Sequence, residues 1–219
     1  MINYIKYVVY LVVFFGYSLA FAGSYEDFFI AIKQDNPAVV RNLLQRGFDA
    51  NTLDPEGRHG LFVALNEPAL KTAQVLVDWP KTRVETRNQA DESPLMMAAL
   101  RGHIEIARKL IARDADVNKT GWTPLHYAST NGHLEVMQLL LDNHAYIDAE
   151  SPNKTTPLMM AASYGTPAAV KLLLEAGADA SLRNMQGLSA IDFAQRSGRA
   201  EVADMIAAAI RGAQPKGRW

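Results

Sequence analysis

The chain repeats a pattern with a period of about 33 residues. Each copy contains a short apolar segment that ends in alanine, such as "PLMMA", "PLHYA" and a second "PLMMA". The repeat alanines are Ala31, Ala64, Ala98, Ala128, Ala161 and Ala194, with successive spacings of 33, 34, 30, 33 and 33 residues. Because a unit of this length buries its apolar face only against its neighbours, the period predicts a linear array of about six units.

The sequence pattern of each unit predicts two short helices. A Ser-Pro or Thr-Pro pair, which caps a helix and then begins it, starts the first helix at residues 93–94, 123–124 and 156–157. Glycines 102, 132 and 165 are expected to end these helices. The second helix has apolar residues at helical spacing and is expected to end at a left-handed residue. That place is taken by Gly47 and Gly177 in two units, and by Asp114 and His144 in two others, where mild strain is expected.

The motifs resemble those of the ankyrin-repeat family. The central unit carries T-P-L-H-x-A at Thr123–Ala128 and a Gly-His pair at Gly132–His133, with close copies at Ser93–Ala98, Gly102–His103 and Thr156–Ala161. The resemblance covers residues 24–211. It implies an all-α fold, an ankyrin-repeat solenoid of about six helix-turn-helix units with projecting β-hairpin loops.

The sequence divides the chain into three parts. Residues 1–22 are interpreted as a signal peptide, residues 23–211 as the ankyrin-repeat domain, and residues 212–219 as a flexible tail. The expected repeats are 24–56, 57–90, 91–120, 121–153, 154–186 and 187–211. The first and last depart from the consensus and are interpreted as caps.

The first 22 residues have the pattern of a secretory signal. Lys6 precedes an apolar run, and Ala20-Phe21-Ala22 supplies the small residues that a signal peptidase accepts. The alternative, an uncleaved anchor, would have to cross the bilayer with an uncharged stretch of about 16 residues, short of the roughly 20 required. Cleavage after Ala22 predicts a periplasmic or secreted protein with no membrane attachment. The absence of cysteine favours the bacterial periplasm over a disulfide-rich secreted class.

Charge and motifs exclude several functions. The formal net charge of −1 gives no basic field for nucleic acid. The five histidines lack metal-ligand spacing, and the sequence has no cysteine nucleophile, phosphate loop or dinucleotide motif. The resemblance implies that His126 and His133 are structural residues: the first ties its turn to the neighbouring backbone, and the second lies in the Gly-His pair that joins the two helices. We therefore expect no catalytic residue, no cofactor and no metal site.

Two units depart from the pattern. In the second, "VDWPKTRVETRN" replaces the usual Gly-Ala-Asp segment, and Pro80 excludes a left-handed cap. In the third, three residues of the loop between Asn118 and Pro124 are missing. The row of loops is therefore expected to have a notch at Trp122.

The resemblance implies partner-binding positions at the loop tips and on the exposed face of the first helices. Arg101, Trp122 and Tyr164 are the expected anchors, because Trp, Tyr and Arg dominate binding hot spots. The alternative is that Trp122 packs on the shortened loop and Tyr164 covers a helix end. The full set is Gln89, Glu92, Leu100, Arg101, Trp122, Thr130, Asn131, Asn153, Thr155, Ser163, Tyr164, Met185, Gln186, Leu188 and Arg196.

The sequence therefore predicts a non-catalytic, monomeric protein that binds another protein. Two partner classes stay open: a periplasmic protein that it scaffolds or stabilises, or a toxin or hydrolase that it blocks as an immunity protein. An enzyme is the third and weakest alternative.

Overall fold

The computed structural model describes residues 23–213, which form short helices joined by turns. The chain divides into two compact units, one through Arg83 and one from Val84 onward, and each is described by itself. The boundary falls within the "VDWPKTRVETRN" segment that departs from the repeat. The predicted signal peptide and residues 214–219 of the predicted tail lie outside the described residues.

Unit 1 is built from two helix pairs. Residues 23–33 form a helix, followed by α2 (Pro37–Gln45), α3 (Gly60–Asn66) and α4 (Leu70–Asp78). Helix α4 packs against both α3 and α2. The core contains the fully buried side chains of Phe28, Ile32, Leu61, Leu65 and Leu76.

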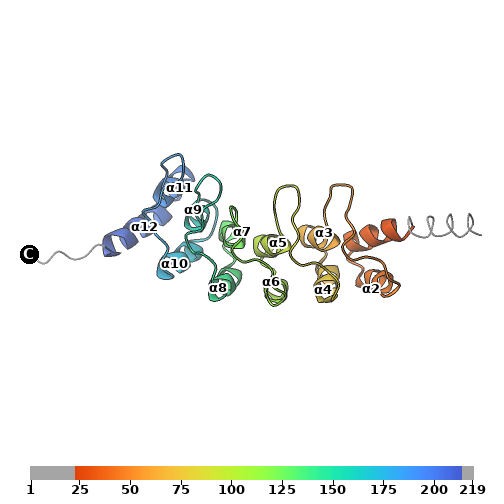
Figure 1. The fold of residues 1–219 in the computed structure, drawn as a ribbon. Coiled ribbons are helices and arrows are strands. Elements are labelled where there is room, and N and C mark those ends of the chain that lie inside the picture. The colour runs from red at the N-terminus through yellow and green to blue at the C-terminus, as the bar shows by residue number, and fades with distance from the viewer. Residues whose placement is uncertain (1–22, 214–219) are drawn as a thin grey trace, which may run out of the picture. The chain divides into compact units, whose positions relative to one another are not determined.

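Unit 2 contains four helix pairs in two rows (Figure 1). The first helices, which pack against one another in chain order, are α5 (Pro94–Arg101), α7 (Pro124–Asn131), α9 (Pro157–Ser163) and α11 (Ala190–Arg196). The second helices form the other row: α6 (Ile104–Ile111), α8 (Leu134–Asp142), α10 (Pro167–Glu175) and α12 (Ala200–Ala213). The predicted helix-turn-helix units are confirmed.

The predicted helix starts of unit 2 are confirmed. The hydroxyls of Ser93 and Thr156 accept from backbone N–H groups in the first turns of α5 and α9, and proline follows each at the first helical position. Gly102 and Gly132 end α5 and α7 in the left-handed conformation, with φ of 72° and 68°. The expected left-handed non-glycine residues are present: Asp114 has φ 63° and His144 has φ 64°.

The expectation that Gly165 ends the first helix of its unit was wrong. Helix α9 ends at Ser163 with Tyr164 as its C-cap, and Gly165 does not have a positive φ. Its neighbours explain the difference, because Pro167 favours an extended Thr166, whose ψ is 155° as the N-cap of α10. A Cβ at Gly165 would lie 2.3 Å from the carbonyl oxygen of Ser129, so glycine is required there by close packing.

The loops before α5, α9 and α11 share one hydrogen-bonded turn. In the loop before α5, Asn88 N–H donates to the carbonyl oxygen of Glu92 over 3.1 Å, and Asp91 N–H donates to the carbonyl oxygen of Asn88 over 3.0 Å. The loops at Ser151–Thr155 and Asn184–Leu188 repeat both bonds. Within residues 23–213, β-type pairing is limited to an isolated antiparallel bridge between Leu53 and His59 in unit 1.

The loop before α7 is shorter, as predicted, and rises less than those before α9 and α11 (Figure 1). Gly121 keeps the left-handed turn, with φ of 82°. Lys119 lies in this loop and is only 6% exposed, and its ammonium group donates to the carboxylate of Asp91 and to the carbonyl oxygen of Thr120. The shortened loop therefore contains a buried lysine whose charge is paired.

Candidate functional site

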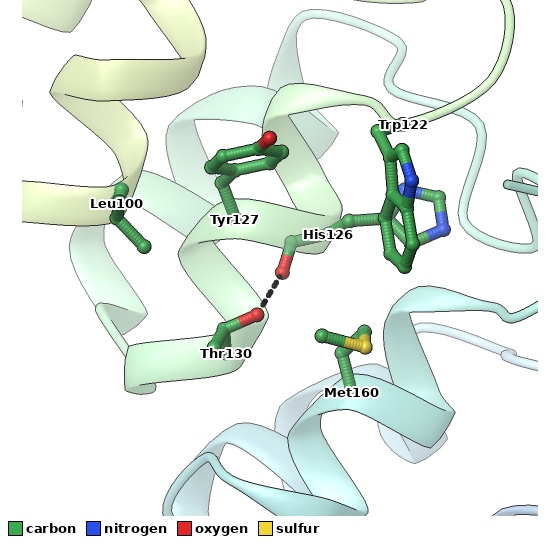
Figure 2. Close-up of a pocket in the computed structure, with 6 residues that line it drawn as sticks. All are labelled: Leu100, Trp122, His126, Tyr127, Thr130 and Met160. Carbon is green, nitrogen blue, oxygen red and sulfur yellow. Dashed lines mark hydrogen bonds between the residues drawn. The ribbon is translucent and has the colours of Figure 1, made fainter. Parts of the chain in front are cut away.

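A pocket of about 260 Å³ opens on the first-helix row of unit 2. Three consecutive units contribute to it, since Leu100 comes from α5, Tyr127 from α7 and Met160 from α9 (Figure 2). Its lining is almost wholly apolar. We call it the Trp122 pocket, defined by Leu100, Trp122, His126, Tyr127, Thr130 and Met160.

Trp122 comes to the pocket from the end of the shortened loop. It directly precedes Thr123, the N-cap of α7, and its half-buried ring makes an edge contact with the imidazole of His126, with 5.2 Å between ring centroids. Figure 2 shows Trp122 on one side of the pocket, with Tyr127 and Met160 on others. Trp122 thus both packs on a neighbour and contributes an aromatic wall.

His126 is held at both ring nitrogens. The backbone N–H of Thr123 donates to Nδ1 over 3.1 Å, so Nε2 carries the proton and donates to the carbonyl oxygen of Thr155 over 2.8 Å. Burial lowers the pKa of His126 to about 4. The imidazole is therefore neutral at pH 7, and it joins two units as the family resemblance implied.

A carboxylate, Glu92, contacts Tyr127, one of the residues that line the pocket. The Tyr127 hydroxyl donates to Glu92 over 2.8 Å, and the amide of Asn88 donates to the other oxygen of Glu92 over 2.7 Å. Burial and this hydrogen bond raise the pKa of Tyr127, so its hydroxyl stays protonated. The half-buried Glu92 is thereby fixed by two neutral donors.

The structure brings together three of the predicted partner-binding residues, Leu100, Trp122 and Thr130, in the pocket. Two others are prominent elsewhere: Tyr164 is 66% exposed and Met185 is 71% exposed. Thr155 is a correction, because it is only 2% exposed and its side chain is not part of the surface. Exposed positions are Gln89, Arg101, Asn131, Asn153, Tyr164, Met185, Gln186 and Arg196, and half-buried ones are Glu92, Ser163 and Leu188.

Some predicted positions also have structural hydrogen bonds. Asn131 donates to the carbonyl oxygen of Leu100 over 2.8 Å, and the hydroxyls of Ser163 and Ser197 are 2.7 Å apart. The backbone N–H of Met185 donates to the carbonyl oxygen of Asn153 over 3.0 Å. These contacts hold neighbouring loops and helix ends together, while the side chain of Met185 stays exposed.

Of the other three pocket residues, His126 was expected to be structural, and Tyr127 and Met160 were not singled out from the sequence. Both directly precede a repeat alanine, Ala128 or Ala161, and so occupy the same position in successive units. Tyr127 also lies three residues before Thr130, which places the two on one helix face. The repeat register was the signal that could have found them.

Two other kinds of site are absent from the described part of the chain. No group of three or more His, Asp or Glu side chains in residues 23–213 is placed to hold a metal ion. Over that range, no helix combines the length and apolar character needed to cross a bilayer.

Comparison with known proteins identifies the repeats. A family model described as "Ankyrin repeats (3 copies)" matches residues 61–151, and another described as "Ankyrin repeats (many copies)" matches residues 144–194. Together they span well over half of the chain. The chain belongs to the ankyrin-repeat family. Ankyrin repeats are protein–protein interaction modules, and the repeat fold is typically non-catalytic.

Relatives agree with this assignment. The chain is 29% identical over 166 residues to the chicken (Gallus gallus) nuclear factor NF-kappa-B p105 subunit, covering 73% of this chain and 17% of that protein. It is 38% identical over 94 residues to the Drosophila melanogaster ankyrin repeat and KH domain-containing protein mask, covering 41% of this chain and 2% of that protein. The chain thus spans only a small part of these relatives.

A solved structure of similar fold is an ankyrin repeat domain from Acinetobacter baumannii. It is similar to this chain with a TM-score of 0.71 and 24% sequence identity, over 83% of this chain and 96% of that one. At this identity the likeness shows the fold alone.

Proposed function

We propose that this ankyrin-repeat protein is exported, acts in the periplasm, and scaffolds or stabilises a protein partner that it binds through the Trp122 pocket. The observation that carries the binding surface is the pocket itself. It is a preformed apolar hollow with two aromatic walls, on the row of first helices. Buried aromatic anchors and the pockets that receive them are where interface energy concentrates.

Partner capture tests the binding role. The purified protein, its Trp122→Ala variant and a Tyr146→Ala variant would each be used as bait in a periplasmic extract, with captured proteins quantified by mass spectrometry. Tyr146 is the matched control, because it is also an aromatic residue, is 67% exposed, and is not among the residues that line the pocket. We expect a protein captured by the wild type and by Tyr146→Ala but depleted with Trp122→Ala.

Two other outcomes of the capture experiment would change the proposal. Equal recovery of all proteins by the wild type and Trp122→Ala would reject the pocket as the binding surface. If the captured partner is a toxin or hydrolase that loses activity when bound, the inhibitory alternative replaces scaffolding.

Export is supported by the first 22 residues, where Lys6, an apolar run and Ala20-Phe21-Ala22 form a signal pattern. Cell fractionation followed by intact-mass measurement tests it. We expect a periplasmic chain that begins at Gly23. Recovery of the full-length chain from the cytoplasm would contradict export.

A further inference from the structure

We infer that the Trp122 pocket receives a long basic side chain, arginine or lysine, from the protein partner. The inference rests on the proposed binding function and specifies the chemistry that the surface recognises. Three features carry it: apolar lining, two aromatic walls and a carboxylate that is hydrogen-bonded to one of those walls.

The apolar lining suits the stem of a basic side chain. Leu100 and Met160 contribute to it from α5 and α9, and the pocket volume of about 260 Å³ accommodates one long side chain. Lysine and arginine bury their methylene stems against apolar surface while the charged end contacts polar groups. The apolar lining alone would also accept leucine or methionine, so the other features decide the choice.

The aromatic walls favour a cation. Trp122 and Tyr127 both line the pocket, from the shortened loop and from α7 (Figure 2). Trp and Tyr rings attract guanidinium and ammonium groups through the ring quadrupole, with Trp the most effective. His126, the remaining ring of the lining, is neutral at pH 7 and adds no opposing charge.

Glu92 supplies the complementary charge. Its two hydrogen bonds come from neutral groups, Tyr127 and Asn88, so its negative charge is not cancelled by them. Two cations of the loops before α5 and α7 pair with other carboxylates. Lys119 contacts Asp91, and Arg87 lies within 2.7 Å of Glu85, 3.8 Å of Asp91 and 3.5 Å of Asp116.

This charge distinguishes a basic occupant from an apolar one. An apolar side chain that covered Glu92 would remove water from the carboxylate without replacing its interactions, which is unfavourable. A guanidinium or ammonium group would replace the lost hydration with an ion pair. The pocket is therefore selective for a positive charge at the end of an apolar stem.

Peptide selection tests the inference. A phage library of randomised linear peptides would be selected on the purified protein and on Trp122→Ala, and peptides that need Trp122 would be synthesised. For each, a version with its basic residue replaced by methionine keeps the length and removes the charge.

Affinities of both peptide versions would be measured for the wild type, Glu92→Gln and Glu135→Gln. The glutamine of the first variant retains an acceptor for the Tyr127 hydroxyl and removes the charge. Glu135 is an exposed carboxylate in the first turn of α8, so its substitution serves as the charge control.

The expected result is that arginine or lysine recurs in the Trp122-dependent peptides. Replacing it with methionine should weaken binding to the wild type by about tenfold or more, and Glu92→Gln, but not Glu135→Gln, should remove most of that difference. Thermal melts would verify that the three proteins are equally folded.

Two results would overturn the inference, and they differ in what else they reject. Trp122-dependent peptides rich in Leu, Met or Phe that bind Glu92→Gln as tightly as the wild type would show an apolar-anchor site, leaving the proposed binding function intact. A selection that yields no Trp122-dependent peptide would reject both the basic occupant and the pocket as the binding surface.

Discussion

At the scale of single residues, one position of the repeat is occupied by histidine in one unit and by methionine in two others. His126 accepts from the N–H of Thr123 and donates to Thr155. Where methionine occupies that position, its sulfur takes over only the first role: Met96 Sδ lies 3.3 Å from the backbone nitrogen of Ser93, and Met159 Sδ lies 3.4 Å from that of Thr156. The sequence alone shows that "PLMMA" has methionine in place of this histidine. It could not reveal the bond that the imidazole makes between units.

The buried imidazole predicts a dependence of stability on pH. Burial lowers the pKa of His126 from 6.5 to about 4 in the folded protein. As the pH falls below about 6.5, the unfolded chain takes up a proton that the folded chain refuses, so the free energy of unfolding decreases until the pH is about 4. The full effect is about 3 kcal/mol.

His126→Met isolates this effect. His59 and His103 also have lowered pKa values through burial, but their contributions cancel when the variant is compared with the wild type. Urea denaturation across this pH range should show the wild type losing about 3 kcal/mol more than the variant. Parallel stability curves would mean that His126 is protonated equally in both states.

At the scale of helices, different residues donate to carbonyl groups at or just beyond the end of the first helix of the preceding unit. The last carbonyls of a helix lack partners within it. His133 Nε2 lies 3.0 Å from the carbonyl oxygen of Leu100, near the end of α5. In the last unit Arg199 stands where histidine is usual, and it donates to the carbonyls of Ala161, Ala162 and Gly165. The terminal cap is thus joined to its neighbour by three charge-assisted bonds.

Helix starts could be predicted from the sequence, whereas one helix end could not. The Ser-Pro and Thr-Pro pairs start a helix through local interactions, so the helix starts can be predicted from the sequence. The end of α9 depends on Thr166-Pro167 and on the approach of Ser129 from the neighbouring unit. Residues that come together only through packing between units leave no local signal.

Gly165→Ala tests this close approach. A Cβ there would lie 2.3 Å from the carbonyl oxygen of Ser129 and 2.9 Å from the Cα of Ala161, so backbone must move. We expect a loss of about 1–3 kcal/mol in the free energy of unfolding, typical of overpacking in a well-packed contact. Gly212→Ala is the control, because a Cβ there would meet no atom within 4 Å and should change stability little. Equal midpoints for both variants in thermal denaturation would contradict the packing argument.

At the scale of the whole molecule, the period of about 33 residues was enough to predict the repeat fold, because repeat arrays are stabilised by contacts between neighbours. The shortened loop at Trp122 was also visible in the sequence. The pocket was not, since it forms only when α5, α7 and α9 place Leu100, Tyr127 and Met160 together. Thr155 shows the converse: its repeat position predicted exposure, and its burial follows from contacts between units.

Partner binding should therefore change the stability of the folded chain in a way that identifies the pocket. A partner that binds only the folded state at 100 times its Kd adds about 2.7 kcal/mol to the free energy of unfolding. For a chain of this size, that corresponds to a rise in Tm of roughly 5–10 °C.

Trp122→Ala separates binding from folding. If the ring acts mainly as a wall of the pocket, the variant should keep nearly the wild-type Tm without partner and lose most of the rise when the partner is added. If the edge contact with His126 dominates instead, the ligand-free Tm should fall and the partner should still raise it by the wild-type amount. Thermal melts of the wild type and Trp122→Ala, each with and without the captured partner, distinguish the two roles because affinity and stability are read from the same four curves.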